Sequence, residues 1–469
     1  MAVGCCFFKE SLPWLGYKIS EFDPCNDFIG VQKYLHLMSN VHSTCTSFFS
    51  ESVNPFYSLN FCDIHKELTT MLSFKKIISL LLILFFSIHS YSQGRKDPGQ
   101  ILVSYLSLGN FSKETAELVL KKMPPLDRLS ANFEVTLYKI KYQTPAPDGQ
   151  MTIASGLVAV PQVSNPIGIV SYQHGTRFNR EDAPSRMKEG DSVYPALFAS
   201  HGGFVTVMPD YLGLGDNELP IHPYVQYETL ASSSVDMLLA AKELAKIIDI
   251  PLNGQLYIGG YSEGGFSSLV LFELLSQYDK EIPISGVALG SAPYDWDETM
   301  RFIMLDPGPR ASAYLAYFFY SLQTYKHYWS DLTQIFVSPY NDLIPELFDG
   351  RHSTKEILNF LPQNPALIFK PEFFEAILNH TERNSENLKN YFNHYDFSPS
   401  APLLLVGTKG DKDVPYHGAE LAYEQFKRHR DDVTLLSVSD TLDHRDAGPY
   451  IFLEMLQFFK KIQENEGHY

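Results

Sequence analysis

Cysteine is missing from most of this 469-residue chain. The five cysteines all lie within the first 62 residues, at Cys5, Cys6, Cys25, Cys45 and Cys62. The remainder of the chain therefore cannot form a disulfide framework, a zinc site built on thiolates or a cysteine nucleophile. Cysteine usage does not identify the compartment in which the protein works.

Basic charge is also scarce. The chain has 37 Lys and Arg residues against 54 Asp and Glu, which gives a formal net charge of −17 at pH 7. Nucleic-acid binding requires a basic stripe that neutralises phosphates, and the sequence has none, so we expect no nucleic-acid partner. The chain also lacks internal repeats and low-complexity segments. Its 45% hydrophobic residues suffice for a sizeable core, and its length is typical of two or three domains.

Only one long hydrophobic run is present, near the N-terminus. Met71 is followed by two lysines, by the apolar run 77–88 and by small residues around Tyr91. This is the order of a charged segment, an apolar segment and a cleavage site in a secretory signal peptide. The run is shorter than the ~20 residues of a membrane span. We therefore expect a signal peptide over residues 71–92 and export to the periplasm or medium; a membrane anchor or a buried helix is the alternative.

Residues 1–70 fall outside this organisation. They show neither clear periodicity nor a domain-like pattern, whereas a signal peptide belongs at an N-terminus. We expect translation to start at Met71 and residues 1–70 to be a non-native extension. The alternative is a genuine cytosolic leader followed by an internal anchor. On the first interpretation, the mature protein is acidic, soluble and without stable membrane insertion.

The next part of the chain predicts a helix and then a hairpin. Apolar residues recur at helical spacing over 101–123, before two prolines. Strand patterns over 133–142 and 151–161 flank a turn-forming segment, which predicts an antiparallel pair. The apolar positions of the first strand change parity midway, and a bulge or a twist would explain this.

Farther along, strand and helix patterns alternate. Strands are predicted at 168–173, 204–208, 255–258, 284–289, 402–406 and 433–438. Helices are predicted at 194–201, 228–247, 264–277, 419–429 and 449–462. This alternation predicts an α/β fold with a mostly parallel central sheet and helices on both faces.

One long segment interrupts the alternation. Residues 293–400 have no strand pattern but much helical and aromatic sequence, densest over 311–320. A segment of this length must fold on itself. We therefore expect an inserted helical cap that divides the core into 93–292 and 401–469. Its aromatic residues are expected to form the core of the cap first and a wall for substrate second.

A glycine-rich turn carries the main chemical signal. Gly260-Tyr-Ser262-Glu-Gly264 follows a predicted strand, precedes a predicted helix and fits the G-x-S-x-G pattern of a nucleophile elbow. A sharp turn exposes the serine oxygen and requires small residues two positions before and after it. Free amides at the helix start can hold a negatively charged oxygen. The pattern arises often by chance, so on its own it is equally compatible with a nucleophile and with an incidental serine in a glycine turn.

The partners of a serine nucleophile come later in the chain, in the required order of serine, acid and histidine. Asp411 lies in the turn after strand 402–406, and Asp413 is the alternative acid; either residue could instead cap the next helix. His444 follows strand 433–438 directly and is the predicted general base. The acid orients the imidazole and stabilises its charged form.

Two backbone amides are predicted to form an oxyanion hole. One belongs to Thr176, in the loop after strand 168–173, and the other to Glu263, directly after the serine. His174 in the same loop is expected to be structural. This chemistry needs neither a metal ion nor an organic cofactor.

Together these stretches resemble the α/β-hydrolase superfamily and, within it, the secretory lipase family of fungal lipase A-type enzymes and their bacterial relatives. The matching stretches are Val170-Ser-Tyr-Gln-His-Gly-Thr176, Met208-Pro-Asp-Tyr-Leu-Gly-Leu-Gly-Asp216 with His222-Pro-Tyr224, Gly260-Tyr-Ser-Glu-Gly-Gly265 and Asp411-Lys-Asp-Val-Pro415. The resemblance implies a serine ester hydrolase with Ser262, Asp411 and His444 in the triad positions. It also implies that Asp210 braces the active-site loops. It does not cover residues 1–70 and does not identify the substrate.

Three functions are compatible with the sequence. The first is an exported carboxylic-ester hydrolase, a lipase or esterase acting on a small ester or lipid; its aromatic cap favours an apolar acyl or aryl group, and an acetyl or feruloyl ester on a polysaccharide is also compatible. The second is a serine exopeptidase of the same fold, which needs a carboxylate pair for the substrate amine. The cap offers Asp306, Asp331, Asp342 and Glu346. The third is a catalytically silent binding protein.

Overall fold

The structure of the protein is a computed structural model that describes residues 101–165, 167–188, 190–278, 282–381, 388 and 394–466. Contacts divide the chain into two compact units between Arg95 and Lys96. The predicted extension 1–70 and the predicted signal peptide 71–92 lie outside the described residues. The fold below is that of the second unit.

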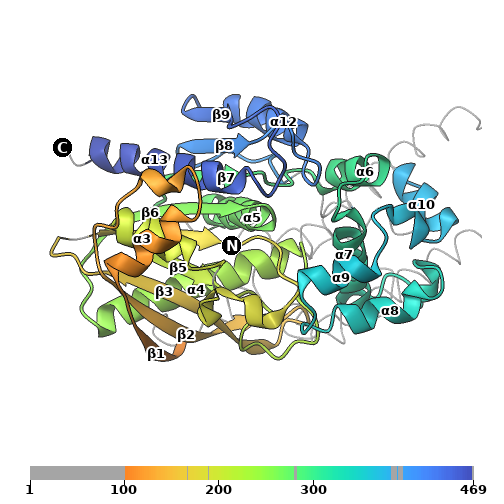
Figure 1. The fold of residues 1–469 in the computed structure, drawn as a ribbon, viewed down its shortest axis with the longest axis horizontal. Helices are drawn as coiled ribbons and strands as arrows, with labels where there is room; N and C mark the ends of the chain where they lie inside the picture. The colour runs from red at the N-terminus through yellow and green to blue at the C-terminus, as the bar shows by residue number, and fades with distance from the viewer. Residues whose placement is uncertain are drawn as a thin grey trace, which may run out of the picture. The chain divides into compact units, whose positions relative to one another are not determined.

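A nine-stranded sheet organises this unit (Figure 1). In sheet order the strands are β1 (Leu102–Phe111), β2 (Val135–Pro145), β3 (Met151–Pro161), β5 (Val205–Pro209), β4 (Ile167–Gln173), β6 (Leu252–Tyr261), β7 (Gly286–Gly290), β8 (Leu403–Gly407) and β9 (Val433–Ser437). The pairs from β1 through β3 to β5 are antiparallel. All pairs from β5 to β9 are parallel. The predicted mostly parallel sheet is therefore confirmed.

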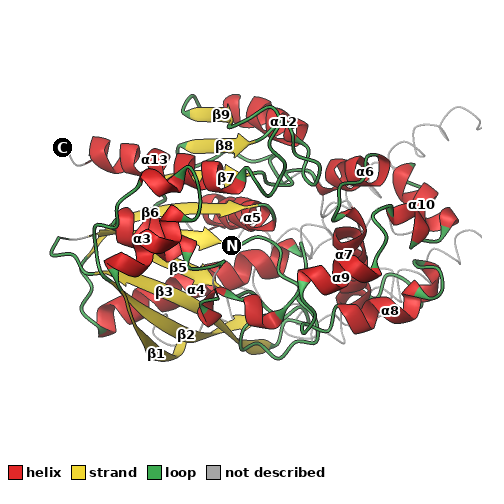
Figure 2. Cartoon of the chain, in the orientation of Figure 1, coloured by secondary structure: helices red, strands yellow, loops and turns green. Residues whose placement is uncertain are grey.

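Helices cover both faces of the sheet (Figure 2). One face packs against α4 (Tyr227–Ile247), α5 (Glu263–Tyr278) and α12 (Tyr416–Lys427). The other packs against α3 (Lys113–Lys121), the π-helix Pro195–His201 and α13 (Gly448–Glu466). Alternate residues of β8 show the same division, because Leu403 and Leu405 belong to the first core cluster and Leu404 to the second. A strand buried on both faces reads as a continuous apolar run.

The N-terminal part corrects one prediction. The helix predicted over 101–123 is instead β1 followed by α3, with Ser112 capping α3 by accepting from the Thr115 amide. The apolar residues of β1 fit a helical spacing, but pairing with β2 decides the conformation, and such tertiary pairing overrides local propensity. Leu106 of this edge strand is 62% exposed.

The hairpin of β2 and β3 is confirmed, with unbroken pairing from Val135↔Pro161 to Pro145↔Met151. The change of parity in β2 is therefore not a bulge against β3. Leu137 packs in the core cluster on one face and Ile140 in the cluster on the other. The parity changes because the covered face changes along the strand.

A helical insertion separates β7 from β8, which are neighbours in the sheet. Its helices are α6 (Trp296–Leu305), α7 (Ala311–Lys326), α8 (Tyr340–Leu347), α9 (Thr354–Phe360) and α10 (Pro371–Leu378). They lie beyond the carboxyl ends of the parallel strands (Figure 2). Buried rings such as Phe319, Phe369 and Phe373 pack on one another, in a hydrophobic cluster that also includes Phe178 and Phe266 from outside the insertion.

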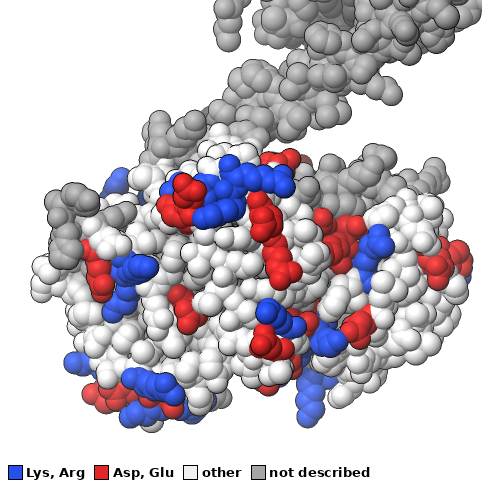
Figure 3. Space-filling view, turned by 90° about the horizontal axis from the view of Figure 1, so that it is seen from above, with Lys and Arg blue, Asp and Glu red and all other residues white. Residues whose placement is uncertain are grey.

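The surface carries charges of both signs. On the face seen in Figure 3, acidic and basic side chains are interspersed. No helix in the described part of the chain is both long and apolar enough to cross a membrane.

Candidate active site

Ser262 lies at the turn between β6 and α5, the position predicted for an elbow. Its φ is 61°, in the left-handed region that residues with a Cβ rarely adopt. The Ser262 amide donates to Gly290 O at 2.8 Å, and the Ser262 carbonyl accepts from the Phe266 amide. The strand end and the first helical turn therefore hold this strained backbone in place.

The two glycines that flank the serine have no room for a side chain. A Cβ on Gly260 would lie 2.1 Å from Gly264 O, and a Cβ on Gly264 would lie 2.0 Å from Gln173 O. Both separations are far below van der Waals contact. The spacing of the motif thus has the steric cause expected from the sequence.

A continuous chain of hydrogen bonds joins the serine, the histidine and the acid. His444 Nε2 lies 2.8 Å from Ser262 Oγ, and His444 Nδ1 lies 2.6 Å from Asp411 Oδ2. When Asp411 is a carboxylate, Nδ1 donates to it and Nε2 is free to accept from the serine hydroxyl. The three side chains can therefore move a proton from the serine oxygen to the imidazole.

Asp411 is fixed by its own loop. Its second oxygen, Oδ1, accepts from the amides of Asp413 and Val414, each at 2.9 Å. The Asp413 side chain turns instead to Arg310, 2.6 Å away. Of the two candidate acids, the structure brings Asp411 to the histidine.

His444 is buried beside two carboxylates. Tyr261 stacks on its ring, with centroids 5.0 Å apart, and the Tyr261 hydroxyl donates to the His444 carbonyl. Burial by itself lowers the pKa of His444, but the attraction of Asp411, with a smaller contribution from Asp413, outweighs burial and raises the pKa above its ordinary value. The imidazolium is thus stabilised where a serine proton would be received.

The loop that carries Thr176 runs beside the serine. A Cβ on Gly175 would lie 3.1 Å from Tyr261 O and 3.5 Å from Ser262 Cβ. Glu263 is the first residue of α5, where an amide has no intrahelical acceptor. Thr176 thus follows a residue that packs against the Ser262 turn, and Glu263 follows Ser262 directly; their role as oxyanion donors stays a prediction. His174, expected to be structural, packs against the Tyr211 ring at a tilt, and burial lowers the pKa of His174 to about 4.

Asp210 connects three segments near this loop. Its Oδ2 accepts from the hydroxyls of Ser155, at 2.5 Å, and Ser185, at 2.6 Å, and its Oδ1 accepts from the Ser185 amide. The carboxylate is buried, and both of its oxygens accept hydrogen bonds. The bracing role that the resemblance implied for Asp210 agrees with these contacts.

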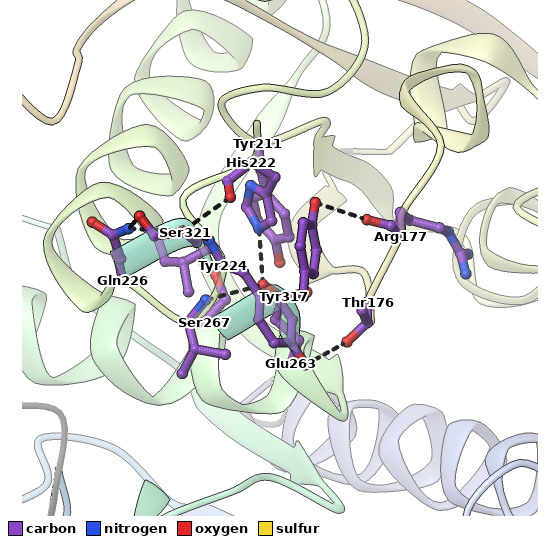
Figure 4. Close-up of polar contacts among 12 residues, drawn as sticks. Thr176, Arg177, Tyr211, His222, Tyr224, Gln226, Glu263, Ser267, Tyr317 and Ser321 are labelled. Carbon is purple, nitrogen blue, oxygen red and sulfur yellow. Dashed lines mark hydrogen bonds and ion pairs between the residues drawn. The ribbon is translucent and has the colours of Figure 1, made fainter. Parts of the chain in front are cut away.

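The side chains of Glu263 and Thr176 make contacts that the sequence did not indicate (Figure 4). Glu263 Oε1 lies 2.8 Å from His222 Nε2, and both side chains are 1% exposed. The hydroxyls of Thr176 and Tyr224 are 3.1 Å apart. His222-Pro-Tyr224 stood out in the sequence as a shared stretch, but nothing in it specified these partners.

The four cap carboxylates named from the sequence have different surroundings. Asp306 binds Lys412, and Asp331 caps the short helix Leu332–Gln334. Asp342 and Glu346 are exposed on α8. Among the residues that the structure describes, no cluster of three or more His, Cys, Asp or Glu is arranged to hold a metal ion.

The chain has relatives among known proteins. A family model described as "Secretory lipase" matches residues 189–426, slightly more than half of the chain. A putative hydrolase from Legionella pneumophila is 60% identical, with a TM-score of 0.77 over 78% of this chain and 98% of its own. No match was found among curated proteins.

Two more distant solved structures share the fold. The rice cell wall degrading esterase LipA from Xanthomonas oryzae is 22% identical, with a TM-score of 0.70 over 79% of this chain and 100% of its own. Lipase A from Candida antarctica in its closed state is 16% identical, with a TM-score of 0.60 over 79% of this chain and 83% of its own. The family model and the close relative carry the assignment further: the chain belongs to the secretory lipase family and is a carboxylic-ester hydrolase of the α/β-hydrolase fold.

Proposed function

We propose that the chain cleaves carboxylic esters through a triad of Ser262, His444 and Asp411 and an acyl-enzyme intermediate. The observation that carries this proposal is the unbroken contact from Ser262 Oγ through both ring nitrogens of His444 to Asp411. The left-handed backbone of Ser262, at the turn where β6 ends, is the second supporting observation.

Acylation begins when Ser262 Oγ attacks the carbonyl carbon of the ester. His444 Nε2 takes the hydroxyl proton as the new bond forms, and the carbonyl oxygen becomes negatively charged. The amides of Thr176 and Glu263 are proposed to donate to that oxygen. When the tetrahedral intermediate collapses, the bond to the alcohol breaks and the alcohol leaves with the proton from His444.

Deacylation repeats these steps with water. His444 removes a proton from the water as it attacks the acyl carbon. The bond between that carbon and Ser262 Oγ then breaks, His444 returns the proton to Oγ, and the carboxylic acid leaves. Asp411 stays ionised throughout, holding Nδ1–H and stabilising the imidazolium. Every proton is carried by these side chains, so no step calls for a metal ion or an organic cofactor.

We propose that the acyl group is apolar. Phe178, two residues after Thr176, packs edge-on against Tyr317 of α7 and lies close to Tyr314 of the same helix. Aromatic side chains of the cap thus pack directly beside the proposed oxyanion loop. An alkyl chain or an aromatic acid that entered among such rings would gain free energy by burial.

We further propose the domain organisation and export read from the sequence. It comprises an extension 1–70, a signal peptide 71–92, core segments 93–292 and 401–469, and a cap 293–400. The family is described as secretory. The boundary between the two compact units, after Arg95, lies close to the proposed cleavage point.

A panel of chromogenic substrates tests the activity. We expect p-nitrophenyl esters of four to eight carbons to be turned over, and Ser262→Ala to lower kcat by on the order of 10⁶-fold. The control is Ser276→Ala, which removes an exposed hydroxyl on the same helix; that hydroxyl bonds Ser400. This variant should keep the wild-type kcat. Turnover of aminoacyl-p-nitroanilides without any ester turnover would overturn the proposal.

A further inference from the structure

The two proposed oxyanion donors are tied to one loop by their side chains. We name residues 222–226 the bracket loop (Figure 4). Glu263 Oε1 meets His222 Nε2 at 2.8 Å and accepts from the Val225 amide at 3.4 Å. Thr176 meets the Tyr224 hydroxyl at 3.1 Å. A single short segment therefore holds both residues whose amides are proposed to flank the reacting oxygen.

The hydrogen bond between His222 and Glu263 can form with either residue as the donor. His222 Nδ1 lies 2.7 Å from Leu212 O, a carbonyl that can only accept, so Nδ1 carries a hydrogen. Nε2 then either donates to the Glu263 carboxylate or accepts from its protonated form. Glu263 Oε2 has no partner among the described residues, so its side chain is anchored through Oε1. Breaking such a buried contact leaves a polar group unpaired, which is costly.

The bracket loop is held in turn by the cap helix α7. The Ser321 hydroxyl accepts from the Tyr224 amide at 3.0 Å and from Gln226 Nε2 at 2.8 Å, and it donates to His222 O at 3.2 Å. One hydroxyl thus uses its full hydrogen-bonding capacity on three residues of the loop. Val225 between them has a φ of 56°, a conformation that persists only where the surroundings impose it.

A second residue of α7 reaches the oxyanion loop directly. The Tyr317 ring stacks on Tyr224, with centroids 4.7 Å apart and planes 26° apart. Its hydroxyl donates to the carbonyl of Arg177, the residue after Thr176, at 3.4 Å. The cap therefore contacts both the bracket loop and the chain that follows the proposed donor.

We propose that His222 and Tyr224 are positioning residues that aim the amides of Glu263 and Thr176, and that Ser321 couples this aim to the cap. The proposal rests on the proposed triad and oxyanion donors. The amides matter most once negative charge develops on the ester oxygen, so a misplaced donor weakens the transition state more than the bound substrate. Loss of positioning should therefore lower kcat and leave KM unchanged.

The contact between Thr176 and Tyr224 gives the cleanest test, because both ends can be changed with little change in shape. We expect Thr176→Val and Tyr224→Phe each to lower kcat on p-nitrophenyl butyrate roughly tenfold, less than the ~10²–10³-fold cost of removing a donor outright. The double variant should be no slower than either single variant, since both changes remove one bond. Thr176→Ser keeps the hydroxyl and should restore turnover.

Two further measurements separate positioning from stability. A trifluoromethyl ketone, whose adduct with the serine carries a negatively charged oxygen, should bind each slow variant weaker by the same factor as kcat falls. Tyr294→Phe also removes a buried hydroxyl, one that bonds Leu289 O, and should keep the wild-type kcat. A lower melting temperature with unchanged kcat, or independent losses in the double variant, would overturn the proposal.

The coupling to the cap is tested on α7 itself. Ser321→Ala should reproduce the loss in kcat, whereas Thr324→Val should not, because the Thr324 hydroxyl bonds Tyr320 of its own helix. Equal turnover in these two variants would remove Ser321 from the proposal. If Ser262→Ala kept its turnover, the proposed function would fail; if only the bracket variants kept theirs, this inference alone would fail.

Discussion

Ser262 sits in a turn that tolerates nothing larger than glycine two positions before or two positions after the serine. In Gly264→Ala the new Cβ would lie 2.0 Å from Gln173 O, so the strand end or the helix start must move. We expect the free energy of unfolding to fall by about 1–3 kcal/mol and most turnover to be lost. Urea unfolding and kcat measure both effects.

The matched control is Gly418→Ala in α12, where the nearest atom to a new Cβ is Glu298 Oε2 at 3.4 Å. This variant should keep wild-type stability and activity. If Gly264→Ala behaved in the same way, the steric account of the elbow would be wrong.

His444 must be neutral to accept the serine proton, so activity should rise with pH through its pKa. Asp411 and Asp413 hold that pKa above its ordinary value against burial and Arg310. Asp413→Asn removes one negative charge and leaves the opposing charge of Arg310, so the pKa of His444 should fall. The acid limb of kcat/KM, which reports the free enzyme, should then move to lower pH. A shift to higher pH would contradict this account.

Two ion pairs join the cap to the loop of the proposed triad acid, and they should differ in strength. Arg310 holds Asp413, whose side chain is 1% exposed, whereas Lys412 and Asp306 are both more than half exposed. Arg310→Met leaves a buried carboxylate unpaired and should cost about 3 kcal/mol. Lys412→Met should cost less than ~1 kcal/mol.

Thermal unfolding of the two variants compares these costs directly. The exposed pair serves as the control, since it joins the same two segments. Equal melting temperatures for Arg310→Met and Lys412→Met would contradict the argument from burial.

The strands of the parallel sheet could be predicted from the sequence because each is a short apolar run buried on both faces, as β8 is. That pattern is local. The prediction of a helix where β1 lies was wrong, because the apolar residues of β1 fit a helical period equally well. The conformation of this segment depends on its pairing with β2. For an edge strand, pairing with a distant neighbour determines the conformation, and the local sequence does not reveal that neighbour.

The residues of the site likewise include some that the sequence could predict and some that it could not. The proposed triad of Ser262, Asp411 and His444 could be predicted because each residue follows a strand end in a known order, and the three side chains are in contact. The contact of His222 with Glu263 joins residues 41 positions apart and depends on how the loop after β5 folds back onto α5. No spacing rule predicts it. Likewise, the sequence could not show which of Asp411 and Asp413 contacts the histidine. That depends on Arg310, which binds Asp413.

At the level of the whole chain, the cysteines define a further expectation. All five lie within the proposed extension 1–70, so the mature protein should contain no disulfide. We expect N-terminal sequencing of exported protein to start near Gln93, and its melting temperature to be the same with and without dithiothreitol. A mature start well upstream of Gln93, or a reductant-sensitive melting temperature, would contradict the proposed processing.

The central claim is that Ser262 is the acylated nucleophile. Its most direct test is mass-spectrometric mapping of the folded enzyme after inactivation with a serine-directed fluorophosphonate. We predict a single adduct on the peptide that contains Ser262, formed in step with loss of ester turnover and absent from Ser262→Ala. Complete inactivation with the adduct on another residue, or with Ser262 unmodified, would contradict the account.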